Sequence, residues 1–292
     1  MLLTNAALTS CSLWRGSTDR CAADEFAAPS VAVAAGLNHL ALCDDFTSDA
    51  SIDKDATLKP GYNWYTSIMR IDGAQKAHVT ATEFTVSNSV LHLNAEEVSG
   101  GYALYSAALL TYSPNSYVGK TYVPPFYLEY RFAVNKSLAP GSLGIAGSTL
   151  RYSWPSVWLN DITLQFAQFS NGTIPHSYAE IDPLEFYVST VGMGAGNWQQ
   201  HSAIHIWDTP TTIDPDNDIS VDWGTTWDDA TYHVVGVLVN STAVYIYFDG
   251  ALMNIMTTTG GFAPAFDASY NLIINPGYQN WPIHVDYVQI WK

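Results

Sequence analysis

Residues 180–185, with the sequence Glu-Ile-Asp-Pro-Leu-Glu, place three carboxylates within a stretch that otherwise has the composition of a β-strand. The side chains of a strand alternate between the two faces of a sheet, so Glu180 and Asp182 share a face and Glu185 is out of phase with them. One residue bulged out of the ladder would return Glu185 to that face. Pro183 suits such a bulge, because a proline cannot donate to a strand ladder. We therefore predict three acids on one surface of a sheet.

Acids set this closely repel one another, so one of them can keep its proton near neutral pH. A protonated carboxyl beside an ionised one is the equipment of a retaining glycosidase, where the two groups stand about 5–5.5 Å apart across the scissile bond. The spacing alone is a weak signal, because 27 acids in 292 residues produce one such triplet by chance roughly 0.2 times per chain. The apolar residues Ile181, Leu184 and Phe186 strengthen it, because they would face an opposite layer.

The composition indicates a large domain with an acidic surface. Hydrophobic residues make up 48% of the chain and charged residues only 13%, so a sizeable core is available. The net charge is −16, and no Lys or Arg occurs between Tyr152 and Trp291. Such a surface repels phosphate backbones and sulfated polymers, so we expect no nucleic-acid partner and favour neutral or cationic ligands. Solubility in salty or acidic surroundings explains most of these acids equally well.

The chain divides into an N-terminal segment and a strand-rich remainder. Residues 1–40 are rich in Ala and Ser and show no strand alternation, so we interpret them as an arm or a processed leader. Residues 41–292 contain many short strands without a helical period, which predicts an all-β sandwich of two antiparallel sheets. The expected strands are Val90–Leu93, Tyr102–Thr111, Tyr127–Val134, Ser153–Asn160, Glu180–Tyr187, His201–Trp207, Tyr232–Asn240, Leu272–Asn275 and His284–Trp291.

One hairpin has a particularly clear signal. Two β-rich runs, Ala243–Phe248 and Ala251–Met256, are separated by the dipeptide Asp249-Gly250. Asp-Gly between two such runs favours a tight type I′ turn.

The cysteines and the N-terminus say little about location. A disulfide between Cys11 and Cys21 would leave Cys43 over, and no zinc-binding spacing exists, so we interpret the three cysteines as structurally incidental. No apolar run approaches the roughly 18 residues of a membrane span. The N-terminus lacks a basic region followed by an apolar one, so no signal peptide is evident.

Aromatic and imidazole side chains offer further candidates. In Trp154-Pro-Ser-Val-Trp158 the two indoles would share a strand face, roughly 13 Å apart, as a platform for sugar rings. Burial of both indoles in the core is the competing interpretation. His201 and His205 would also share a face, but the sequence shows no third ligand, so we do not predict a metal site there.

The acid motif and its neighbours resemble glycoside hydrolase family 16, in the bulged form shared by laminarinases, agarases and carrageenases. The resemblance covers residues 42–292, and Pro183 departs from it at a position that usually holds Ile, Val or Phe. The other matching segments are residues 42–46 as the opening strand, 128–131, 153–158 as a Trp-Pro-x-x-Trp strand, 232–237 with 245–250 as a hairpin, and 283–291 as the closing strand.

The resemblance implies a β-jelly-roll with a concave face that binds a polysaccharide. It makes Glu180 the nucleophile and Glu185 the acid/base, with Asp182 tuning the nucleophile and no cofactor required. The expected activity is endo-acting, retaining hydrolysis, with a β-1,3-glucan as the first substrate and an agarose-type galactan as the second. Transglycosylation, a non-catalytic β-glycan-binding lectin and a structural β-domain remain as alternatives.

The resemblance also implies binding residues. Trp154 and Trp158 would line subsites on the non-reducing side, and we expect His205 to contact substrate. A structural calcium ion on the convex side would be held by Asp44 or Asp45 together with Asp286. We expect a monomer, and we infer secretion from the substrate class.

Overall fold

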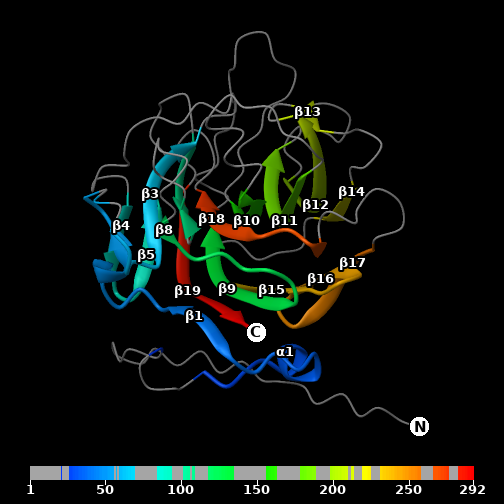
Figure 1. Cartoon of the computed structure of the whole chain (residues 1–292), viewed down its shortest axis with the longest axis horizontal. Coiled ribbons are helices and arrows are strands. Elements are labelled where there is room, and N and C mark those ends of the chain that lie inside the picture. Colours follow the sequence, from blue (N-terminus) through cyan, green and yellow to red (C-terminus); the bar gives the residue numbers. More distant parts are fainter. Residues whose placement is uncertain are drawn as a thin grey trace.

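The computed structural model describes residues 21, 26–55, 57, 59–69, 84–93, 101–105, 107–108, 118–134, 156–162, 178–188, 198–209, 212–213, 219–224, 231–257, 266–275 and 282–292. Within these residues the chain forms two large sheets, one short helix and one 3-10 turn. Figure 1 shows the strands in two facing layers, with the C-terminal strand beside the first one. None of the described helices is long and apolar enough to cross a membrane.

The first layer is called the β9 sheet. Its path runs through β17 (Ala251–Thr257), β16 (Ala243–Phe248), β15 (His233–Val239), β9 (Phe126–Val134), β19 (Ile283–Trp291), β5 (Val90–Leu93) and β4 (Phe84–Ser87), and β1 (Leu40–Asp44) also pairs with β19. All of these pairings are antiparallel.

The second layer is called the β11 sheet. Its path runs through β13 (Thr212–Ile213), β12 (Trp198–Thr209), β11 (Tyr178–Val188), β10 (Ser156–Asp161), β18 (Tyr270–Asn275), β6 (Gly101–Tyr105), β3 (Trp64–Met69) and β2 (Ile52–Asp53), and β14 (Ile219–Gly224) also pairs with β12. β7 (Ala107–Ala108) and β8 (Val118–Gly119) form a separate pair, and the 3-10 turn η1 spans Asp49–Ser51. Only β2 and β3 run parallel among the described pairs.

The core lies between the two sheets and follows the alternation of their strands. Leu128 and Phe132 of β9 face Ile181 of β11 and Leu272 of β18 across a single buried cluster. Burying each such side chain stabilises the fold by about 1.5–3 kcal/mol. The predicted all-β sandwich of antiparallel sheets is therefore confirmed.

The predicted hairpin is confirmed as well. β16 and β17 pair in antiparallel register from Ala243 opposite Thr257 to Phe248 opposite Ala251. Between them, Asp249 has a φ of 48° and Gly250 a φ of 79°. Both residues are in the left-handed region, as a type I′ turn requires.

Part of the N-terminal segment packs on the outer face of the β9 sheet (Figure 1). Helix α1 (Ser30–Ala34) places Ala32 in a buried cluster that includes Tyr127, Leu238 and Trp291. Backbone hydrogen bonds in both directions between His39 and Lys292 join this segment to the C-terminus.

The interpretation of the cysteines as incidental is wrong. Cys21 and Cys43 form a disulfide, with their Cα atoms 5.7 Å apart. The pairing arises because the segment from residue 26 folds back over the β9 sheet and returns to strand β1, which carries Cys43. The Cys11–Cys21 disulfide considered from the sequence does not form, because Cys21 is bonded to Cys43. Cys11 itself lies outside the described residues.

Candidate active site

The acid motif lies in β11, which has an extra residue relative to both of its neighbours. The register against β12 shifts between Asp182 and Glu185, and the register against β10 shifts between Ile181 and Leu184. Pro183 lies inside both intervals. The predicted bulge is therefore confirmed, and Pro183 occupies it.

The bulge puts the three acids on one face of the β11 sheet. Ala179, Ile181 and Leu184 all belong to the core between the sheets, so the residues that alternate with them face away from it. Glu180 and Asp182 precede the bulge, and Glu185 follows it on the same face. An unbulged strand would have turned Glu185 toward the core.

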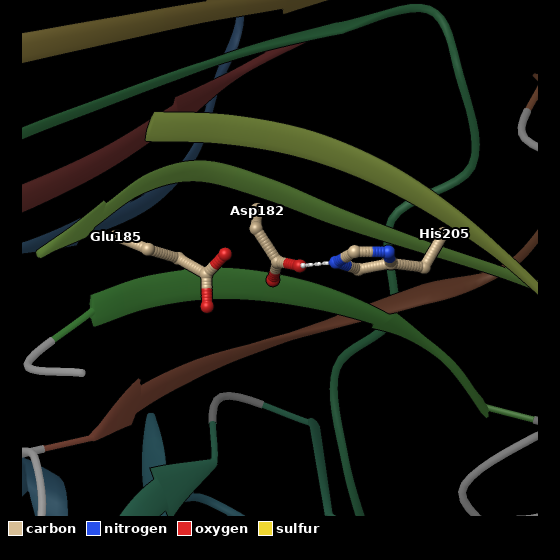
Figure 2. A group of neighbouring side chains, drawn as sticks. All are labelled: Asp182, Glu185 and His205. Atoms are coloured by element: carbon tan, nitrogen blue, oxygen red, sulfur yellow. Dashed lines mark ion pairs between the residues drawn. The ribbon is translucent and has the colours of Figure 1, made fainter. Parts of the chain in front are cut away.

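Each acid of β11 lies beside a nitrogen of a β12 side chain. Glu180 Oε2 accepts from Trp207 Nε1 at 2.7 Å, Asp182 Oδ2 lies 3.2 Å from His205 Nε2, and Glu185 Oε2 lies 3.0 Å from His201 Nε2. Figure 2 shows Asp182 between Glu185 and His205, with its carboxylate directed at the imidazole. Glu185 is directly opposite His201 in the register. Glu180 is opposite His205 and Asp182 is opposite Ala203, so their contacts with Trp207 and His205 run diagonally to a residue two positions along β12.

Electrostatics favour a proton within this cluster. Burial raises the pKa of Glu180 well above its ordinary value, and the charges of Asp182 and Glu185 raise it further. The charge of His205 and the hydrogen bond from Trp207 oppose these effects and lower the pKa. The β12 side chains therefore stabilise negative charge where the neighbouring acids destabilise it.

The same side chains could also hold a cation. One ligand atom each from Asp182, Glu185 and His205 lie within 4.8 Å of one another, the only such group of three found in the described parts of the chain. The sequence showed no third ligand beside His205, because the register of β11 on β12 brings the acids to it. A carboxylate pair and an imidazole suit several divalent ions.

Of the two predicted tryptophans, Trp158 lies on the acid-bearing face and Trp154 lies outside the described residues. Val157 and Leu159 of β10 are in the core, so Trp158 between them faces away from it. Its side chain is only 7% exposed. Trp158 therefore forms part of the floor of this face.

Sequence reasoning missed Asn160 and Asn271. Asn160 of β10 is opposite Glu180 on one side and Asn271 on the other. Both asparagines are fully buried, and neither carboxamide has a hydrogen-bond partner within the described part of the chain. Leaving a buried amide unpaired costs about 1–3 kcal/mol. The two carboxamides beside Glu180 can therefore still form hydrogen bonds with a polar ligand. The register of β10 places Asn160 opposite Glu180 and Asn271 opposite Asn160, and sequence alone does not show that register.

The residues named for calcium do not form a comparable cluster. Asp286 Oδ2 is 2.6 Å from Arg131 Nη1, so its charge is already balanced by a guanidinium. Asp44 accepts hydrogen bonds from the Phe46 backbone and from Trp64 Nε1. No described group of three metal ligands includes Asp45 or Asp286. The geometry gives calcium no support here, and its binding at Asp45 and Asp286 stays a prediction.

Comparison with known proteins confirms the resemblance at the level of the fold. Neither a protein-family model nor a curated protein matches the sequence. Solved structures of glycoside hydrolase family 16 do match. A family 16 endo-glucanase from Bacteroides ovatus is 14% identical, with a TM-score of 0.56, and the match covers 85% of this chain and 99% of that one.

Two further structures match in the same way. The endo-β-1,3-glucanase from Pyrococcus furiosus is 15% identical, with a TM-score of 0.54 and coverage of 87% of this chain and 94% of that one. The GlcNAcα1-4Gal-releasing endo-β-galactosidase from Clostridium perfringens is 14% identical, with a TM-score of 0.52 and coverage of 87% and 62%. The chain therefore has the β-jelly-roll fold of family 16.

Proposed function

We propose that this chain is an endo-acting, retaining glycoside hydrolase that cleaves a neutral β-linked polysaccharide. The observation that carries the proposal is the bulge at Pro183, which sets Glu180, Asp182 and Glu185 on one face beside donors from β12. A bulge that serves packing alone has no need for three carboxylates on the face turned away from the core. The fold shared with family 16 structures supports the same conclusion.

The proposed mechanism requires Glu185 in its protonated form and Glu180 in its ionised form when substrate binds. Glu185 donates this proton to the departing glycosidic oxygen while ionised Glu180 attacks the anomeric carbon, which gives a covalent glycosyl-enzyme. Glu185, now ionised, takes a proton from water as that water attacks the same carbon and releases Glu180.

The neighbouring side chains have supporting roles in this scheme. Trp207 donates to Glu180 and favours its ionised form, which opposes the pKa-raising effect of burial. His201 Nε2 lies 3.0 Å from Glu185 Oε2, within hydrogen-bond distance of the carboxyl that gives up and regains the proton. Asp182 lies between Glu185 and His205 (Figure 2), and its charge favours the protonated form of Glu180.

The substrate class follows from charge. The stretch without Lys or Arg carries the acid motif, so a sulfated glycan would meet no compensating cation there. A β-1,3-glucan is the first choice, in line with the endo-β-1,3-glucanase among the matched structures, and a neutral galactan is the second. A secreted location belongs to the proposal, because a glycan polymer is an extracellular substrate and the Cys21–Cys43 disulfide requires an oxidising environment.

The test is an assay of new reducing ends on laminarin, lichenan, agarose and κ-carrageenan. We expect the wild type to cleave laminarin and the Glu180→Gln and Glu185→Gln variants to be inactive. Thr85→Ser, on the other sheet, is the control for expression and handling. If the wild type binds a glycan but releases no reducing ends from any of the four, the hydrolase proposal is wrong and the protein is a lectin. Products longer than the substrate would indicate a transglycosylase.

A further inference from the structure

A pair of histidines lies on the β9 sheet, on the face that points away from the core. His92 of β5 and His284 of β19 are directly opposite each other in the ladder. Their sequence neighbours Leu91 and Val285 are fully buried in the core, so both imidazoles point outward, and each is partly exposed. The two Nδ1 atoms are 2.7 Å apart, and the ring centroids are 4.8 Å apart.

We propose that His92 and His284 bind one divalent transition-metal ion of the Cu²⁺, Ni²⁺ or Zn²⁺ class. The two Nδ1 atoms lie within hydrogen-bond distance of each other, and the tautomers of the two rings decide which one donates. Neutral imidazole is a preferred ligand of these ions, whereas Ca²⁺ and Mg²⁺ take oxygen ligands. The pair therefore selects against Ca²⁺ and Mg²⁺.

The geometry needs only a small adjustment. Two metal–nitrogen bonds of about 2.0–2.1 Å at a tetrahedral angle place the nitrogens roughly 3.3 Å apart. Opening the 2.7 Å contact to that distance requires small rotations of two partly exposed rings. The flanking residues in the same row are Thr85 beside His92 and Ala133 beside His284, both small.

The coordination sphere is open on its outer side. No described His, Cys, Asp or Glu joins the pair to make a group of three ligands. Asp286, further along β19, is paired with Arg131. Water completes the sphere, so the ion exchanges readily. The net charge of −16 raises the local concentration of cations around the protein.

The test is isothermal titration of the full chain with NiCl₂, CuCl₂, ZnCl₂ and CaCl₂. We expect a transition-metal isotherm that His92→Gln and His284→Gln each weaken by at least roughly 10–100-fold, the loss that removal of a mere outer-shell partner already causes. His39→Gln is the matched surface control. Circular dichroism establishes that each variant is folded. Both histidine variants should weaken binding, because each removes one of the two ligands.

His205→Gln separates this pair from the acid cluster, which also has metal-binding geometry. Binding that survives both His92→Gln and His284→Gln and disappears in His205→Gln overturns the proposal. So does a wild type that binds none of the three transition metals. Cleavage of laminarin does not enter this test, because the histidine pair and the acid cluster lie on different sheets.

Discussion

Replacing Trp207 with Phe isolates a hydrogen bond that favours the ionised form of Glu180. The indole Nε1 donates to Glu180 Oε2 at 2.7 Å, and phenylalanine keeps an aromatic ring there while it removes the donor. The pKa of Glu180 is already raised by burial and by the charges of Asp182 and Glu185. The variant therefore raises that pKa further.

The size of the shift follows from the strength of the lost bond. A hydrogen bond to a charged group contributes about 1.5–3 kcal/mol. One pKa unit corresponds to about 1.4 kcal/mol, so we expect a rise of roughly 1–2 units. Glu180 attacks in its ionised form, so the acidic limb of the pH profile of kcat/KM moves to higher pH by the same amount.

The assay is the pH dependence of laminarin cleavage by wild type and Trp207→Phe. Trp291→Phe is the matched control, because Trp291 Nε1 also donates to a side chain, Gln289, but on the other sheet. An acidic limb that stays in place, or moves to lower pH, would refute the assignment of Glu180 as the ionised nucleophile. Equal shifts in both variants would point to general destabilisation.

Three further predictions concern stability. The folded-state pKa of Glu180 lies above its unfolded value, so ionising this residue costs stability as pH rises from about 4.5. Glutamine cannot ionise, so in thermal melts the melting temperature of Glu180→Gln should exceed that of wild type by a margin that grows between pH 4 and 8. Gly236→Ala would place a Cβ against the Tyr127 hydroxyl, and urea titration should show a loss of roughly 1–3 kcal/mol. Cys43→Ser opens a disulfide that spans 22 residues, so urea titration of the oxidised protein should show a loss of about 3 kcal/mol, with Cys11→Ser as the control.

The parts of the fold that sequence predicts are those governed by local alternation. The alternation of β11 requires a bulge if Glu185 is to share a face with Glu180, and Pro183 marks where the bulge lies. The residues of this one strand are therefore enough to predict it. The Asp249-Gly250 turn is equally local, because its conformation depends on two residues.

The parts that sequence does not predict depend on which strands become neighbours. Trp207 and His201 lie more than ten residues from the acids they contact, and only the register of β12 on β11 pairs them. Asn160 lies opposite Glu180 in the same way, through the register of β10 on β11. The Cys21–Cys43 disulfide depends on how the N-terminal segment folds back, and cysteine spacing carries no information about that path.

Deleting Pro183 tests whether the bulge sets the face of the acids or only their spacing. Because this residue is extra in both ladders, its removal leaves Leu184 facing the core and Glu185 opposite His201. Deleting Leu184 instead moves Pro183 into a regular, core-facing position of a central strand. That exchange loses a ladder hydrogen bond, about 1 kcal/mol, and most of a leucine's burial, about 1.5–3 kcal/mol.

We therefore expect the Pro183 deletion to melt near wild type and the Leu184 deletion to be clearly less stable in urea titration. In the Pro183 deletion variant the three acids keep their face, but Glu185 loses the extra residue that separates it from Glu180. Laminarin cleavage by this variant therefore tests the spacing between the two glutamates alone. A retained fold with lost activity would show that the bulge positions Glu185 for chemistry. Equal destabilisation by both deletions would show that Pro183 is not the residue excluded from the ladder.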